Sequence, residues 1–167
     1  MSEGGMEAAV ADLYRDHGAR ALRLAFLLTG NKATAEDLVQ DAFVRLLGRL
    51  RSIRDPHALN AYLGRTIVNL AKNHHRRGSR AAAHLNGASQ SEPVVTSLPD
   101  IEGRDELHAE LLRLPYRQRA ALVMRYCEDL PETEVATLLG TSPKGVRSLV
   151  GRGLTTLRSA NGRNADG

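Results

Sequence analysis

The residues with the clearest chemistry are the basic side chains of TSPKGVRSLVGRGLTTLR, residues 141–158. Apolar residues recur there at helical spacing, and four cations occur without a carboxylate. The outward face of this helix would carry Lys144, Arg147, Ser148, Gly151 and Arg152. Gly145 lies on the same side. Because arginine and serine can read base edges in the major groove and lysine can hold phosphate, the segment predicts a DNA-binding helix. The alternative is a basic helix that covers a protein core.

The residues around the start of this helix have the spacing of a helix-turn-helix. Ala136 lies four residues before Gly140, and Val146 lies six residues after it. Two helices that cross closely need a small residue at the crossing, a glycine in the turn and a branched apolar residue to fill the core. Ser142 is a suitable N-cap, and Pro143 can occupy the first helical position.

Two further helices in the first half of the chain each carry a polar face. The apolar stripe of AEDLVQDAFVRLL leaves Asp37, Gln40, Asp41 and Arg45 together on the opposite side. The segment AYLGRTIVNLAKNHHRRGSR has a polar stripe made of Arg65, Asn69, Lys72, Asn73 and Arg76, followed by Arg77. Asparagine amides can pair with bases and the cations can hold phosphates. Either face could instead be ordinary solvated surface.

The net charge is +4, and no acidic residue occurs between Asp55 and Glu92, so a polyanion is the expected partner. The sequence also lacks the motifs of common enzyme sites. The GNK at 30–32 lacks the glycine pattern of a phosphate loop. Adjacent His74 and His75 would point about 100° apart on a helix and cannot chelate a metal together. We therefore expect no catalytic residues, no metal, no cofactor and no small-molecule substrate, and we expect the single Cys127 to lie in the core.

The pattern along the 167 residues predicts an all-α fold with two small helical domains on a flexible linker. The expected helices cover about 6–28, 33–50, 57–77, 103–113, 116–128, 132–139 and 143–158. The expected division is a first domain at 1–78, a linker at 79–102, a second domain at 103–160 and a tail at 161–167. The chain has no apolar run of transmembrane length, and its one cysteine favours a reducing compartment, so a cytoplasmic protein is expected.

Taken together, these motifs resemble the extracytoplasmic-function (ECF) sigma factors of bacterial RNA polymerase, especially the actinobacterial SigE-family type. The motifs that carry the resemblance are FLLTGNKATAEDLVQDAF, AYLGRTIVNLAKN, LPYRQRAALVMRYCEDLPETEVATLLG and RSLVGRGLTTLR. The resemblance as a whole covers about residues 8–159.

The resemblance implies a role for each polar face. Asp37, Gln40, Asp41 and Arg45 would contact the clamp helices of the largest polymerase subunit. The minus-ten promoter element would be melted and held by the loop at 51–57 and by Arg65, Asn69, Lys72, Asn73, Arg76 and Arg77. The helix-turn-helix would bind the minus-thirty-five duplex beside the polymerase flap. Many members of the family are also held inactive by an anti-sigma factor.

A second class of protein remains open from the residues. An ordinary two-domain regulator would use the helix-turn-helix to bind DNA alone and would sense a ligand with residues 6–77. A sigma factor would instead become specific for promoters only with core polymerase, in the cytoplasm and at the nucleoid.

Overall fold

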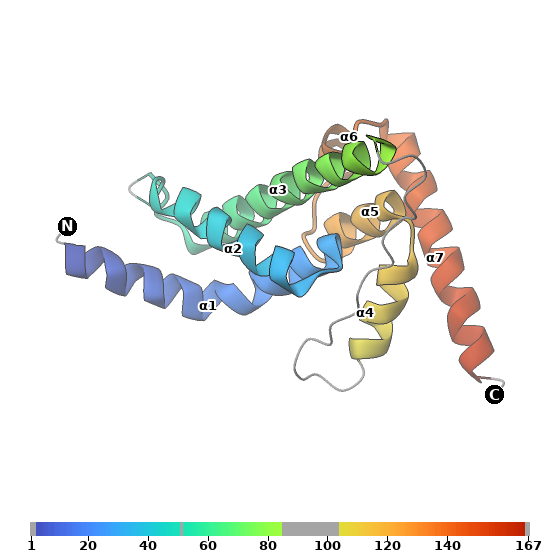
Figure 1. Cartoon of the computed structure of the whole chain (residues 1–167), viewed down its shortest axis with the longest axis horizontal. Helices are drawn as coiled ribbons and strands as arrows, with labels where there is room; N and C mark the ends of the chain where they lie inside the picture. Colours follow the sequence, from blue (N-terminus) through green and yellow to red (C-terminus); the bar gives the residue numbers. More distant parts are fainter. Residues whose placement is uncertain (1–2, 51, 85–103, 166–167) are drawn as a thin grey trace. The chain divides into compact units, whose positions relative to one another are not determined.

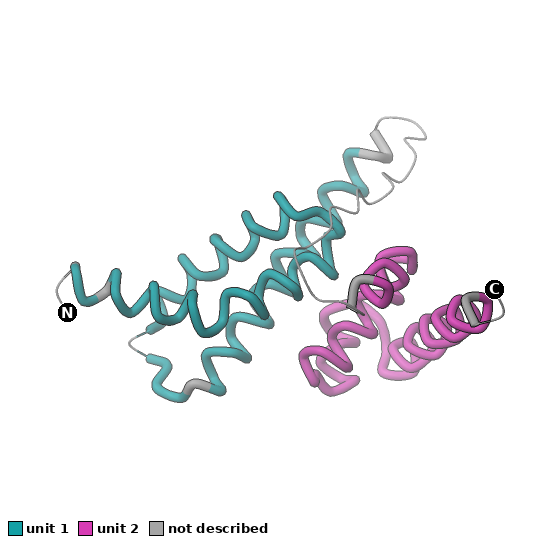
Figure 2. The backbone as a smooth tube through the Cα atoms, turned by 90° about the horizontal axis from the view of Figure 1, so that it is seen from below, with its two compact units in different colours: residues 1–90 teal, residues 91–167 magenta. Residues whose placement is uncertain are grey.

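A computed structural model describes residues 3–50, 52–84 and 104–165, and every regular element within these ranges is an α-helix (Figure 1). In chain order the helices are α1 (Glu3–Thr29), α2 (Lys32–Leu47), α3 (Pro56–His84), α4 (Arg104–Arg113), α5 (Tyr116–Tyr126), α6 (Glu132–Leu139) and α7 (Pro143–Ala165). They form two compact units, residues 1–90 and 91–167 (Figure 2). The predicted all-α class with two helical units is confirmed.

The first unit is a bundle in which α1, α2 and α3 all contact one another. Its core comes from the predicted apolar stripes, with Ala42 and Leu46 of α2 and Ile67 of α3 fully buried. The end of α1 is buried on all sides, because the five consecutive residues 24–28 have almost no exposed surface. The exposed ring of Tyr14 packs on the buried ring of Phe43, and the two ring centres lie 5.3 Å apart.

The junction between α1 and α2 follows local sequence signals. Gly30 adopts a left-handed conformation with φ of 69°, which ends α1. The side chain of Asn31 then accepts a hydrogen bond from the backbone N–H of Thr34 at 3.0 Å and caps α2. The predicted stop at Gly30 is confirmed, and Asn31 provides the cap.

Two helices are longer than the sequence pattern predicts. The helix expected at 57–77 continues to His84, and the one expected at 143–158 continues to Ala165. Gly78 does not end α3, because its φ is not positive and it continues the helix. A single glycine inside a helix costs only about 1 kcal/mol against alanine. Residues 85–102 of the predicted linker lie outside the described residues.

The second unit is built on α5, α6 and α7, which contact one another, with α4 touching α7. Val135 of α6 and Val146 of α7 are completely buried, and Ala136 is 3% exposed where these helices approach. Gly140 has φ of 64° and supplies the left-handed turn between them. The predicted helix-turn-helix core is therefore confirmed.

Cys127 is not a core residue, and that expectation was wrong. It follows the last residue of α5 as the C-cap, and its side chain is exposed. The apolar periodicity of α5 does not extend to this position, because the helix ends at Tyr126 and the chain turns toward α6.

Gly153 of α7 packs directly against Leu122 of α5, and a larger residue there should destabilise the second unit. A Cβ atom at this position would lie 2.7 Å from the Cδ1 of Leu122, which is itself buried. Gly153→Val should therefore lower the free energy of unfolding by about 1–3 kcal/mol through overpacking. The measurement is urea unfolding followed by helical circular dichroism.

The matched control is Gly151→Val on the same helix. A Cβ at Gly151 meets nothing within 4 Å, so both variants change helix propensity alike but only Gly153→Val overpacks. Equal stability of the two variants would mean that the close packing at Gly153 is unimportant.

Candidate polymerase and nucleic-acid interfaces

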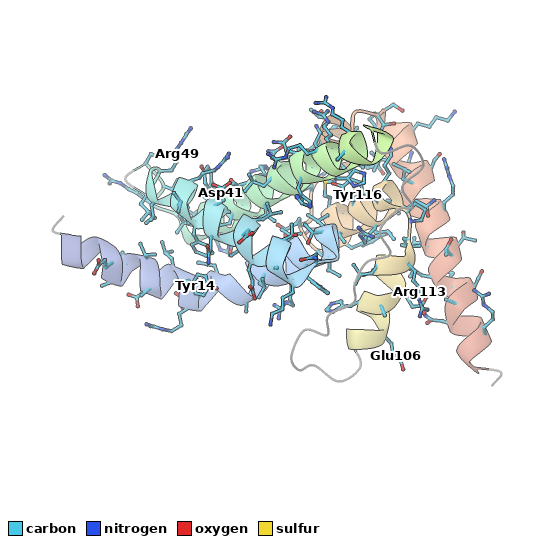
Figure 3. All side chains as sticks on the ribbon, in the orientation of Figure 1. Tyr14, Asp41, Arg49, Glu106, Arg113 and Tyr116 are labelled. Carbon is cyan, nitrogen blue, oxygen red and sulfur yellow. The ribbon has the colours of Figure 1, made fainter. Side chains whose placement is uncertain are left out.

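The outer face of α2 presents the four residues that the sequence assigned to it. Burial of one stripe of this helix in the bundle leaves Asp37, Gln40, Asp41 and Arg45 exposed. The Nε of Arg45 lies 3.3 Å from the Oδ1 of Asp41, one helical turn away. Figure 3 shows Asp41 on α2, with Arg49 beyond the end of the helix. Both members of the pair remain about half exposed and can exchange this contact for one with a partner.

Val44 belongs to the same face but was missed by the sequence analysis. Its side chain is 65% exposed, and it lies three residues after Asp41 and four after Gln40. Residues at this spacing are neighbours on a helix surface. The α2 face (Asp37, Gln40, Asp41, Val44 and Arg45) is thus an apolar side chain surrounded by polar ones, which is the composition of many protein interfaces. The helical spacing could have revealed Val44, but its apolar character suggested burial.

The polar stripe of α3 is accessible along most of the helix. Arg65, Asn69, Asn73, Arg76 and Arg77 are exposed, whereas Lys72 is half-buried. Arg80, also exposed, extends the stripe by one turn beyond Arg76. Since α3 contains no acidic residue, its positive charge is not neutralised within the helix. A basic helical stripe with two amides suits a nucleic-acid strand.

The start of α7 is fixed by the predicted cap. The Oγ of Ser142 accepts a hydrogen bond from the backbone N–H of Gly145 at 3.1 Å, and Pro143 is the first helical residue. Gly145 is half-buried against the turn, where an added Cβ would collide with the Oγ1 of Thr141. Gly145 therefore leaves room for the Thr141 side chain at the turn, and its place on the DNA-facing side of α7 stays a prediction.

All five outward residues predicted on α7 are exposed, namely Lys144, Arg147, Ser148, Gly151 and Arg152. Three of them line an open groove together with Gln118 of α5 and two threonines further along α7. The groove residues are Gln118, Ser148, Gly151, Arg152, Thr155 and Thr156. Gln118 was missed because it lies on a different helix, far away in the sequence.

An ion pair joins the two helices of the helix-turn-helix. Nη1 of Arg147 lies 2.7 Å from Oε2 of Glu132, the first residue of α6. Glu132 was also missed, because no local motif indicates a partner fifteen residues away.

Two family models match these same segments. Sigma-70 region 2 matches residues 13–81, which include the α2 face and the α3 stripe, and Sigma-70 region 4 matches residues 104–157. The RNA polymerase sigma-E factor of Streptomyces avermitilis is 33% identical over 147 residues, covering 82% of this chain and 76% of that protein. The chain belongs to the ECF sigma factors. It is thus a member of a family of transcription initiation factors, and the family resemblance inferred from the sequence is confirmed.

Other relatives of this sigma factor agree. The ECF RNA polymerase sigma factor SigE of Mycolicibacterium smegmatis is 33% identical over 153 residues, which cover 88% of this chain and 59% of that protein. Among solved structures, the co-crystal structure of the sigma factor RpoE with the anti-sigma factor NepR from Bartonella quintana matches with a TM-score of 0.63 at 20% identity. That match covers 89% of this chain and 95% of the other. It supports the fold.

Arg119, in the region 4 unit of this sigma factor, is a buried cation that the sequence analysis did not single out. Arg119 is 8% exposed and donates from Nη1 to the carbonyl oxygens of Leu112 at 3.2 Å and Leu114 at 3.3 Å. Its guanidinium carbon lies 5.8 Å from the centre of the Tyr116 ring. Figure 3 labels Tyr116 at the start of α5. Burial lowers the pKa of Arg119 and raises that of the Tyr116 hydroxyl. Arg119 is therefore a structural residue that holds the end of α4.

Two negative findings concern only the described part of this sigma factor. Within these ranges, no group of three or more His, Cys, Asp or Glu side chains is placed to hold a metal ion. No helix there has both the length and the hydropathy needed to cross a bilayer.

Proposed function

We propose that this sigma factor binds core RNA polymerase through the α2 face, which meets the clamp helices of the largest subunit. The exposed carboxylates of Asp37 and Asp41 would meet basic residues of the polymerase, and Val44 would supply the apolar centre. Support comes from the exposure of these side chains on one helix within the segment that matches region 2.

The α3 stripe would contact the minus-ten element. Its cations would follow the phosphates of the melted strand, while Asn69 and Asn73 would pair with bases. Exposure of both amides and the lack of acidic residues on α3 support this role. The loop at 51–57 would contact the same minus-ten element.

The α7 helix would read the minus-thirty-five element as duplex DNA beside the polymerase flap. The single observation that carries the proposal is the exposed cationic face of a capped recognition helix, with Lys144, Arg147 and Arg152 on it. Lys144 would hold phosphate, whereas Arg147 and Ser148 would contact base edges.

These roles divide the chain into a polymerase and minus-ten domain at 1–78, a linker at 79–102, a minus-thirty-five domain at 103–160 and a tail at 161–167. The protein would itself perform no catalysis and would need no cofactor, since the polymerase supplies the chemistry. It would act in the cytoplasm, where polymerase and chromosome meet, and an anti-sigma factor would be its natural inhibitor.

Run-off transcription with purified core polymerase tests the proposal. Core enzyme with this protein should give template-specific transcripts from fragments of the source genome, whereas core enzyme alone should not. The protein alone should bind the same fragments weakly and without preference. Specific DNA binding by the protein alone, with no transcript and no co-elution with core, would instead indicate the two-domain regulator.

A further inference from the structure

The ion pair between α6 and α7 brings a carboxylate to a surface that is otherwise basic. From residue 141 to residue 158 the chain has four cations and no acidic residue. Oε2 of Glu132 nevertheless lies 2.7 Å from Nη1 of Arg147, and the Arg147 side chain remains 60% exposed. An acidic group beside a DNA-binding face repels phosphate, so its presence there calls for a physical reason.

Stability of the fold is a weak reason for this pair. Exposed ion pairs contribute little, because solvent screens them and both side chains lose conformational freedom. The crossing of α6 and α7 is already held by the fully buried Val135 and Val146 and by the Ser142 cap. Removing the Glu132 charge should therefore leave the helix-turn-helix folded.

The geometry of Arg147 offers a better reason. A long helical side chain points back toward the N-terminus of its helix, which here is the side of the turn and of α6. Gly151, one turn further along α7, has no side chain to support Arg147 from the other direction. The contact with Glu132 occupies one edge nitrogen of the guanidinium and leaves other donors available.

We propose that Glu132 is a specificity-determining residue that holds the guanidinium of Arg147 in the orientation that reads a base pair. Ordering the arginine before binding reduces the entropy lost when it forms two parallel hydrogen bonds with a guanine edge. The inference rests on the proposed role of Arg147 at the minus-thirty-five element.

The test uses holoenzyme made from core polymerase and the full chain. The probe is a pool of promoter fragments with a randomised minus-thirty-five element, sequenced before and after binding. In Arg147→Ala, the preference at one base pair should be lost. In Glu132→Gln, the preference at that same base pair should fall by about threefold or more, a typical size for coupled neighbours. The double variant should match Arg147→Ala, because the glutamate acts only through the arginine.

Glu134→Gln is the matched control. Glu134 lies in the same first turn of α6 and carries the same charge. Both glutamine variants remove one negative charge and should raise overall DNA affinity alike, but only Glu132→Gln should change the preference at the Arg147 base pair.

Three outcomes would overturn the inference. Glu132→Gln could keep the full preference while Arg147→Ala loses it, which leaves the role of Arg147 intact but removes that of Glu132. It could sharpen the preference, which would make the glutamate a competitor of DNA. It could weaken the preference equally at all base pairs, which would indicate a general charge or folding effect. By contrast, an unchanged preference in Arg147→Ala would contradict the proposed function itself.

Discussion

Replacing Asp41 with arginine should lower the affinity for core RNA polymerase by at least about tenfold, or ~1.4 kcal/mol. The substitution reverses the charge at an exposed position of the α2 face and would place a cation against basic residues of the polymerase. It also breaks the pair with Arg45, which costs the helix only about 0.3–0.5 kcal/mol. The fold should therefore survive. The affinity can be measured by titrating fluorescently labelled protein with core polymerase.

Asp12→Arg is a suitable control for this experiment. Asp12 is exposed on α1, outside the α2 face, and its Oδ1 lies 3.0 Å from the Nη1 of Arg15 one turn later. Like Asp41→Arg, it reverses one exposed charge and breaks one short-range ion pair. If Asp12→Arg weakens core binding as much as Asp41→Arg, the effect reflects the net charge of the protein, and the assignment of the α2 face is wrong.

Replacing Arg119 with methionine should destabilise the region 4 unit by about 2–4 kcal/mol. Methionine keeps the length and the apolar stem but leaves the buried carbonyls of Leu112 and Leu114 without the donor that now serves both. It also removes the cation beside the Tyr116 ring. In a unit of this size, each kcal/mol lowers the melting temperature by roughly 4–8 °C. Hydrogen exchange on the full chain should show faster exchange in residues 104–165 and little change in residues 3–84.

The control for this prediction is Arg117→Met, which removes the same charge from an exposed position of the same helix. A surface substitution of this kind typically changes stability by no more than about 0.5 kcal/mol. Equal exchange rates in the two variants would show that the hydrogen bonds of Arg119 do not hold the end of α4.

Local patterns in the sequence predicted most of the secondary structure. The turn glycines at 30 and 140, the Ser142 cap and the core positions Ala136 and Val146 depend on residues close together in the chain, so their spacing alone identified them. Helix ends were predicted less well. No single residue decides whether a helix continues past a glycine such as Gly78, because the cost of one glycine is small against the gain from the turns on either side.

The sequence by itself determined the fold class, the family and the polar faces of three helices, since amphipathic periodicity and short motifs record them. The tertiary structure decided which side chains of different helices meet and which side chains remain exposed. It placed Glu132 against Arg147, buried Arg119 at the end of α4, exposed Val44 among polar neighbours and left Cys127 outside the core. These contacts depend on how helices cross and where they end, and residues that lie far apart along the chain leave no periodic signal of their meeting.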